Sequence, residues 1–304
     1  MRKILSLIAA LAVSAVTYAQ GALSFIQEEH NPAAAGLAGS AYASTSLGTA
    51  YSVFGNPAAQ PLASNRFDAS LSYRGFSSVH TLNAGVAMRF GKFGISAGFL
   101  TSLYPEVQGA SDGGGTLSPF KPTASLFGLG LSLGIGEHIG LGANVRYGIQ
   151  QLDKTTALNA INFDVMAMFK TGGLGITAGV VGLGPNVKSV SNSTYPLPSS
   201  ARLGVDYALP LGPVALEAVA GFDYYFSGNI GAGLGVQVGY NDLAFARVGF
   251  RYGSKKEDFN ATPVPTHLSL GLGGKLFGIR LDVAYQLLLE GQGGMLSAGL
   301  SYSF

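Results

Sequence analysis

Histidine and cysteine, the side chains that most often ligate metals or attack substrates, are sparse in this sequence. The chain has no cysteine, which excludes disulfides, thiol nucleophiles and cysteine-ligated metals. Its histidines stand far apart, without the i, i+4 pairing or the adjacent carboxylate that is typical of metal ligands. We therefore expect no bound metal, and we expect each histidine to lie in a turn or at a rim. The histidines are His30, His80, His138 and His267.

The carboxylates do not form an acid–base pair within one segment. Glu217 and Asp223 share one face of a predicted strand, but six extended residues separate them by about 20 Å. That distance is too long for a shared proton or for two groups flanking a scissile bond. The glycines at 128, 130 and 134 miss the G-x-G-x-x-G spacing and open no helix. The sequence predicts neither an enzyme nor a cofactor, although a triad assembled across strands would leave no trace in it.

Charged residues instead recur at every second position of extended segments. In segment 278–289, Arg280 and Asp282 share the face opposite to Leu281 and Val283. This period of two is typical of a strand with two different environments on its faces. The same parity places seven arginines and six carboxylates on one side. These are Asp68, Arg74, Arg89, Arg146, Asp164, Arg202, Asp206, Glu217, Asp223, Arg247, Arg251, Arg280 and Asp282.

The elements that must position these charges are strands. The pattern predicts about fourteen, and strands tilted in a bilayer need roughly 9–11 residues to cross it. Boundaries inferred in this way shift by a few residues, so twelve or sixteen strands also stay open. The predicted spans are 66–75, 79–90, 92–102, 122–136, 139–150, 158–170, 173–183, 199–209, 213–226, 228–240, 243–253, 264–276, 278–289 and 293–304.

The composition indicates that the second environment is lipid. Hydrophobic residues make up 47% of the chain and charged residues only 11%, against about 25% charged in soluble domains. After the leader, no run of about 18 apolar residues could form a spanning helix. Apolar residues diluted by alternation favour an all-β fold, a transmembrane antiparallel β-barrel with outer-membrane lipid around it.

Within such a barrel the charges belong in the lumen, because Lys or Arg at the lipid midplane costs about 2–4 kcal/mol. Their signs are nearly balanced, whereas a selective open pore tends to carry one sign. Ion pairs that brace a filled interior are therefore our first interpretation. The alternative is that these charges merely face water in the lumen.

The connections between predicted strands alternate in length. Short turns fall at every second junction, for example at 91–92, 137–138 and 241–242, and longer links such as 103–121 and 184–198 fall at the others. Short periplasmic turns opposite longer outer loops are the expected asymmetry of outer-membrane barrels. An even strand number would then place both termini in the periplasm.

The first residues predict export. Met1–Lys3 is basic, residues 4–15 are apolar, and Thr17–Ala19 is a small-residue cleavage site, so residues 1–19 form a predicted signal peptide. Removing Arg2 and Lys3 lowers Lys+Arg from 18 to 16, which equals the 16 Asp+Glu. A neutral mature chain argues against nucleic acid as a partner.

The last residues predict insertion into the outer membrane. Leu300, Tyr302 and Phe304 share one strand face, and the sequence given ends on the aromatic residue. This ending resembles the C-terminal signal through which outer-membrane proteins are recognised by their assembly machinery. An ordinary edge strand is the alternative interpretation.

Residues 20–65 precede the barrel domain, 66–304, and lack strand periodicity. Asn31–Pro32 is a good helix start, and the small residues up to Ala43 would make a thin helix. Inward-facing glycines on strands 122–136, 228–240 and 264–276 would let another backbone approach. We therefore expect residues 20–65 to fold into the lumen as a helical plug. A periplasmic tail is the alternative.

Two motifs in this plug resemble a known family. Residues 36–43, Gly-Leu-Ala-Gly-Ser-Ala-Tyr-Ala, are followed by Val-Phe-Gly-Asn-Pro-Ala-Ala at 53–59. Together they resemble the N-terminal signature of FadL-like outer-membrane proteins, most closely the PorV/PorQ branch of Bacteroidetes. The resemblance implies a fourteen-stranded barrel with an N-terminal hatch. The residues that carry it are Gly36, Leu37, Gly39, Ala41, Asn56, Pro57 and Ala58.

The resemblance implies two different functions. PorV and PorQ are accessory barrels of type IX secretion, so our first hypothesis is a non-enzymatic subunit that binds proteins of a surface or secretion machine. FadL imports long-chain fatty acids, so the alternative is a channel for small hydrophobic molecules. The predicted outer loop 103–121 is polar and rich in glycine, unlike an apolar capture groove, and this favours the first hypothesis.

Overall fold

The computed structural model describes residues 23–108, 118–151, 157–188, 194–254, 262–289 and 293–304. Strands dominate it, and the few helices are short. The helices are η1 (Ser24–Gln27), α2 (Pro32–Ala35) and η2 (Pro57–Leu62). The strands are β1 (Phe67–Phe76), β2 (Val79–Phe90), β3 (Phe93–Leu103), β4 (Thr123–Ile135), β5 (Ile139–Gln151), β6 (Ala157–Thr171), β7 (Leu174–Leu183), β8 (Val187–Lys188), β9 (Thr194–Tyr195), β10 (Ser200–Leu211), β11 (Val214–Tyr225), β12 (Ile230–Tyr240), β13 (Ala244–Gly253), β14 (His267–Leu276), β15 (Ile279–Leu288) and β16 (Gly294–Ser303).

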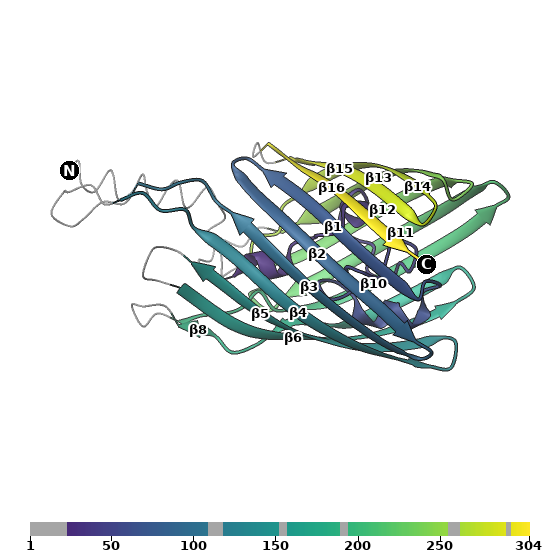
Figure 1. Cartoon of the computed structure of the whole chain (residues 1–304), viewed down its shortest axis with the longest axis horizontal. Helices are drawn as coiled ribbons and strands as arrows, with labels where there is room; N and C mark the ends of the chain where they lie inside the picture. Colours follow the sequence, from purple (N-terminus) through teal and green to yellow (C-terminus); the bar gives the residue numbers. More distant parts are fainter. Residues whose placement is uncertain (1–22, 109–117, 152–156, 189–193, 255–261, 290–292) are drawn as a thin grey trace.

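Fourteen of the described strands close an antiparallel barrel, which confirms the predicted fold (Figure 1). Each strand pairs with its neighbours in the chain, and β16 returns to pair with β1 from Asp68↔Ser303 to Phe76↔Met295. The predicted spans agree with the observed strands to within three residues. The short strands β8 and β9, which the sequence did not predict, pair with each other between β7 and β10.

The two ends of the barrel differ. At one end, which we call the short-turn end, strands are joined by tight connections such as residues 91–92, 212–213 and 277–278. Asn241 and Asp242 in another of these turns both have positive φ, 51° and 55°, the backbone that matches the twist of a β-hairpin. At the opposite, long-loop end the connections include residues 104–122, 184–199 and 254–266.

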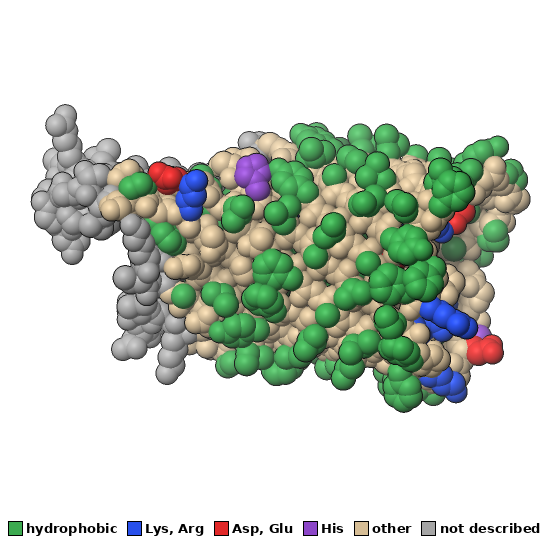
Figure 2. All heavy atoms as spheres, viewed as in Figure 1, with side chains coloured by type: hydrophobic (Ala, Val, Ile, Leu, Met, Phe, Trp, Pro, Cys, Tyr) green, Lys and Arg blue, Asp and Glu red, His purple; other side chains and the backbone are tan. Residues whose placement is uncertain are grey.

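Side chains alternate between two environments along each strand. The outward positions carry large apolar residues such as Leu131, Leu234 and Leu272, whose side chains are more than half exposed. Figure 2 shows hydrophobic side chains over the barrel wall, with charged side chains visible near its two ends. This apolar surface suits hydrocarbon, since a closed barrel leaves no backbone group unpaired in lipid. Among the described residues, no helix is long and apolar enough to span a membrane.

The described residues that precede β1, 23–65, lie inside the barrel, and we call them the lumen segment (Figure 1). Leu23 N donates a hydrogen bond to Oε1 of Gln150, near the long-loop end. Ser64 and Asn65 lie at the short-turn end, where their carbonyls accept hydrogen bonds from Arg89. The segment therefore runs along the lumen. The predicted signal peptide, 1–19, lies outside the described residues.

The prediction that both termini lie in the periplasm stays a prediction, because residues 1–22 lie outside the described residues. Phe304 is at the short-turn end, where its carbonyl accepts hydrogen bonds from the backbone of Arg66 and Phe67. Leu23 is near the opposite end. Between Leu23 and β1 the lumen segment folds back on itself, since His30 packs against Phe54 and the Asn56 amide donates to the Tyr42 carbonyl. The first described residue and the last residue of the chain therefore lie at different ends of the barrel.

The predicted helix after Asn31 is much shorter than expected. Asn31 does cap it, since its Oδ1 accepts a hydrogen bond of 3.0 Å from Ala33 N. The helix ends at Ala35, however, and the backbone turns at Ala38 and Gly39, which have positive φ of 58° and 62°. Small side chains let the chain turn tightly, and the plug is therefore made of turns with short helices.

Glycines permit the lumen segment to approach the wall closely. A Cβ placed on Gly271 of β14 would lie 3.0 Å from Cα of Gly36, and one on Gly235 of β12 would lie 3.0 Å from Leu37. These two contacts match the expected glycine wall. Gly85 of β2, which the sequence did not single out, plays the same role, since a Cβ there would overlap the Ala50 carbonyl.

Candidate functional site: a cavity in the barrel lumen

All thirteen charged residues assigned to the lumen point inward in the structure. Eleven are buried, and Arg74 and Arg89 are partly buried. Three groups are brought together as ion pairs, and the remaining charges contact other partners. The ion pairs are Arg146–Asp164, Arg202 and Arg251 with Asp223, and Arg247 and Arg280 with Asp282.

Most of the remaining charges hold the lumen segment. Arg74 pairs with Glu28 of this segment. Asp68 accepts a hydrogen bond of 2.6 Å from Thr49 N. Glu217 accepts hydrogen bonds from the hydroxyls of Ser44 and Ser46 at 2.5 and 2.7 Å. Asp206 lies beside Glu217, and Arg89 donates to backbone carbonyls near the start of β1. Eight of the thirteen predicted charges thus form ion pairs with one another, and Asp68, Arg74 and Glu217 anchor the segment.

The cluster around Asp223 both braces the wall and holds the segment. Asp223 of β11 accepts from Nε of Arg202 at 2.8 Å and from the guanidinium of Arg251 at 2.5 Å. The hydroxyl of Tyr42, in the lumen segment, donates to the same carboxylate at 2.5 Å. The Arg202 guanidinium also lies 4.1 Å from the centre of the Tyr42 ring, close enough for a cation–π interaction. These contacts fix the segment near the long-loop ends of the wall strands β10, β11 and β13.

The predicted plug motif lies within these contacts. Gly36 and Leu37 pack against glycines of the wall, Gly39 supplies the turn after α2, and Ala41 is partly buried. Asn56 caps η2 by accepting a hydrogen bond of 2.9 Å from Ala58 N. The Asn56 amide also donates to the Tyr42 carbonyl, which ties the two motifs together. Pro57 and Ala58 are buried beside Gly140 and Gly142 of β5.

The predicted insertion signal faces outward. Leu300, Tyr302 and Phe304 are each about half or more exposed, at 49%, 46% and 66%. The Phe304 ring stacks on Phe67 of β1, with 5.2 Å between ring centroids. The aromatic end therefore closes the seam between the first and last strands on the surface that contacts lipid. Its recognition by the assembly machinery stays a prediction.

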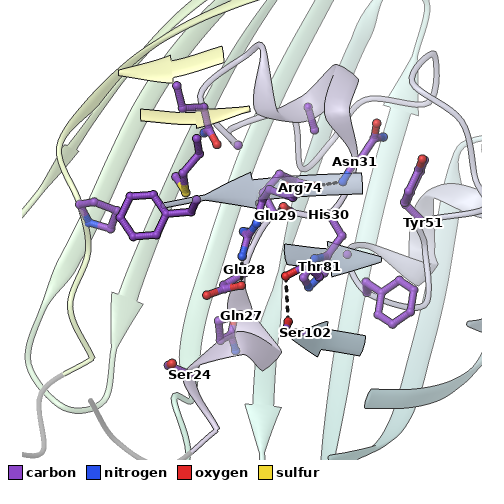
Figure 3. Close-up of a pocket in the computed structure, with 18 of the residues that line it drawn as sticks. Ser24, Gln27, Glu28, Glu29, His30, Asn31, Tyr51, Arg74, Thr81 and Ser102 are labelled. Atoms are coloured by element: carbon purple, nitrogen blue, oxygen red, sulfur yellow. Dashed lines mark hydrogen bonds and ion pairs between the residues drawn. The ribbon is translucent and has the colours of Figure 1, made fainter. Parts of the chain in front are cut away.

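A cavity of about 770 Å³ lies between the lumen segment and the wall. Its strand residues, such as Thr81, Ser102 and Gln286, all come from the long-loop half of the barrel. Tyr104 and residues 262–265 extend the lining into the connections at that end. Figure 3 shows residues of the lumen segment, including Gln27, Glu28 and His30, beside Arg74, Thr81 and Ser102 of the wall in the lining of the cavity. The lumen segment therefore forms the floor of a chamber in the long-loop half.

Two histidines contribute to this chamber, contrary to the prediction that all would lie at turns or rims. His30 and His267 are buried and line the cavity, whereas His80 and His138 are exposed. His267 falls on the inward parity of β14, so the strand pattern carried a signal for it. His30 could not be placed in the same way, because the lumen segment has no regular period.

The chamber is lined by polar and apolar side chains together. Within the described ranges, no group of three or more His, Cys, Asp or Glu residues is placed to hold a metal ion. Most of the buried carboxylates are held by arginines or by donors of the lumen segment, and Asp206 lies beside Glu217. The site is a partly apolar chamber with a polar framework, which is the usual character of a small-molecule pocket.

Comparison with solved structures identifies the same architecture. The CymD monoaromatic hydrocarbon channel matches with a TM-score of 0.60 at 12% identity, covering 90% of this chain and 97% of that chain. The Pseudomonas putida toluene transporter TodX matches with a TM-score of 0.58 at 13% identity, covering 84% and 93%. A Pseudomonas aeruginosa FadL homologue matches with a TM-score of 0.55 at 13% identity, covering 90% and 98%. The sequence matches no protein-family model and no curated protein.

A closed barrel with an apolar outer surface and a filled polar lumen defines the protein as an outer-membrane β-barrel, in contact with membrane lipid. Within this class its fold is that of the FadL-like barrels. At 12–13% identity the likeness concerns the fold.

Proposed function

We propose that the protein is a channel for the uptake of small hydrophobic molecules across the outer membrane, and that it is not an enzyme. The observation that carries this proposal is the chamber between the lumen segment and the wall. Its volume of about 770 Å³ is within the range of small-molecule pockets, about 300–1,000 Å³. Solved structures with this fold include a toluene transporter and a monoaromatic hydrocarbon channel, which supports a substrate of that size.

In this proposal the long-loop end faces the cell exterior and the short-turn end faces the periplasm. A molecule enters the chamber from outside and meets the lumen segment as its floor. The Tyr42–Asp223 contact and the Ser44 and Ser46 contacts with Glu217 hold that floor in place. Passage therefore requires the floor to shift or a side exit to open.

Uptake of radiolabelled toluene by cells with and without the protein tests this function. We expect faster uptake with the wild-type protein and a loss of this gain in Ser102→Phe, because Ser102 lines the chamber and the added ring would fill it. Thr101→Phe is the matched control, since it lies on the same strand and points to the opposite face. Uptake that is the same with and without the wild-type protein would contradict the proposal.

The first hypothesis from the sequence, an accessory subunit of PorV/PorQ type in type IX secretion, rests on the motifs at 36–59 and stays a prediction. It requires a protein partner bound in fixed proportion. A pull-down in mild detergent measures this, and recovery of the barrel alone would contradict the hypothesis. The solved structures of similar fold support the channel better.

A further inference from the structure

Part of the connection between β13 and β14 folds into the barrel. Residues 262–265 line the chamber, and we call residues 262–266 the strap. Val264, in the centre of the strap, is buried against the inward face of two glycines that pair across strands, Gly231 of β12 and Gly253 of β13. A Cβ on Gly253 would overlap the Val264 carbonyl oxygen, and one on Gly231 would lie 3.0 Å from Val264 Cγ1. The strap therefore packs directly on a smooth part of the wall.

Hydrogen bonds hold the strap at both ends. The backbone N of Thr262 donates to Ser227 Oγ at 2.9 Å, and its carbonyl accepts from Asn229 Nδ2 at 2.7 Å. At the other end, the carbonyl of Thr266 accepts a hydrogen bond of 3.0 Å from Leu289 N. Because both ends are tied to neighbouring connections and strands, the strap is a fixed part of the chamber.

The strap presents apolar and rigid surface to the chamber. Pro263 and Pro265 are partly exposed, and both line the cavity. A proline has a fixed φ and no N–H group, so these positions offer ring carbons and no backbone donor. A molecule that touches the strap therefore meets a surface that suits hydrocarbon and that yields little.

A second apolar connection lies across the barrel from the strap. The strap packs on β12 and β13, and β3 and β4 are each seven steps from these strands in either direction around the barrel. Tyr104 and Pro105, in the β3–β4 connection, line the same chamber. A backbone pair between Val107 and Phe120 holds that connection together. A molecule that enters at the long-loop end thus passes between connections from opposite walls.

We propose that the strap is the size filter of the channel, in which Pro263 and Pro265 contact the apolar body of an entering molecule and limit the ring system that reaches the chamber. This inference rests on the proposed channel function and names the residues that restrict its substrates. A strap that is pinned at both ends cannot widen for a bulky molecule. In such a rigid apolar site, one extra methylene changes discrimination by about 10–200-fold.

Uptake of two hydrocarbons tests the filter. Toluene has one ring and 1-methylnaphthalene has two, and the gain over cells that lack the protein is measured for each. The double variant Pro263→Ala with Pro265→Ala trims both rings of the strap, so the ratio of 1-methylnaphthalene to toluene uptake should rise about tenfold. Pro196→Ala is the matched control, because Pro196 is a partly exposed proline in another connection of the long-loop end, outside the lining. An unchanged ratio in the double variant would overturn the inference.

A single thiol tests the contact without relying on uptake. The chain has no cysteine, so Pro265→Cys introduces the only thiol. We expect toluene to slow its reaction with a water-soluble maleimide, because both occupy the space beside the strap. The attached maleimide should then abolish toluene uptake. Pro196→Cys should show neither effect, and a Pro265→Cys thiol that toluene does not protect would contradict the contact.

The two measurements separate failure of the filter from failure of the channel. If wild-type protein gives no gain in toluene uptake and toluene protects no thiol, the channel function and the filter both fail. If toluene enters through the wild-type protein while the strap variants change neither the uptake ratio nor the thiol reaction, only the filter fails.

Discussion

The Tyr42 hydroxyl donates a hydrogen bond of 2.5 Å to Oδ2 of Asp223, although the two residues are 181 positions apart in the sequence. Asp223 is fully buried and also forms ion pairs with Arg202 and Arg251. One carboxylate thus joins three wall strands to the segment that fills the lumen. Removal of the Tyr42 hydroxyl group therefore tests how firmly the lumen segment is anchored to the wall.

Removing that hydroxyl should loosen the lumen segment without unfolding the barrel. In Tyr42→Phe, Asp223 keeps both arginines, so the free energy that holds the lumen segment against the wall should fall by about 1 kcal/mol. The backbone amides of residues 37–50 should therefore exchange about fivefold faster. Hydrogen exchange followed by mass spectrometry measures this. Tyr73→Phe is the control, because the Tyr73 hydroxyl bonds to the exposed His80. Equal exchange in Tyr42→Phe and wild type would show that the hydroxyl does not hold the segment.

The close approach of the lumen segment to β2 predicts that Gly85→Ala disturbs the plug. A Cβ at Gly85 would overlap the Ala50 carbonyl, whereas a Cβ at Gly148 of β5 would meet its neighbours at 3.5 Å or more. We therefore expect Gly85→Ala to expose the segment to proteinase K, and Gly148→Ala to leave it protected. Protection of the segment in both variants would mean that the wall can yield at β2.

A covalent link between the lumen segment and the wall tests whether the floor must move. The chain has no cysteine, so Ser40→Cys with Gly233→Cys introduces a single pair. A Cβ at Gly233 would lie 3.4 Å from the Ser40 Cβ, close to the spacing in disulfides, about 3.5–4.5 Å. We expect toluene uptake to be lost on oxidation and restored by reduction. Ser40→Cys alone should respond to neither treatment, and uptake through the oxidised double variant would place the exit elsewhere.

The outward face predicts a depth-dependent cost for a positive charge. Leu234 lies in the middle of β12 and is 65% exposed, whereas Leu276 lies at the short-turn end of β14 and is 58% exposed. Leu234→Arg should cost about 2–4 kcal/mol and Leu276→Arg about 0–1 kcal/mol. Urea unfolding in phospholipid vesicles measures both. Similar costs for the two variants would argue against a bilayer centred on β12.

The sequence predicted the barrel well because two solvents act on every strand. Lipid outside and a polar lumen inside force a period of two, and this period placed Arg280 and Val283 on opposite faces. Strand boundaries followed from the same pattern, since the turns interrupt it. The short strands β8 and β9 were not predicted, because a strand of two residues is too short to show an alternating pattern.

The site was only partly predictable, for a different physical reason. The lumen segment is held by individual contacts such as Arg74–Glu28, and no periodicity relates a turn residue to the strand that it meets. The sequence therefore indicated that small residues would fill the lumen, but it did not indicate which charges would hold them. The burial of His30 depends on the same path of the chain, and it became visible only in three dimensions.

The path of the lumen segment also has a consequence for how the molecule is built. Residue 65 joins the wall at the short-turn end, while Leu23 sits near the other mouth of the cylinder. The carbonyl of Phe304 accepts hydrogen bonds from the backbone of Arg66 and Phe67. These two residues stand where the lumen segment ends and the first barrel strand begins. The filling of the lumen and the closure of the wall therefore meet at residues 65–67, and a substitution there would disturb both at once.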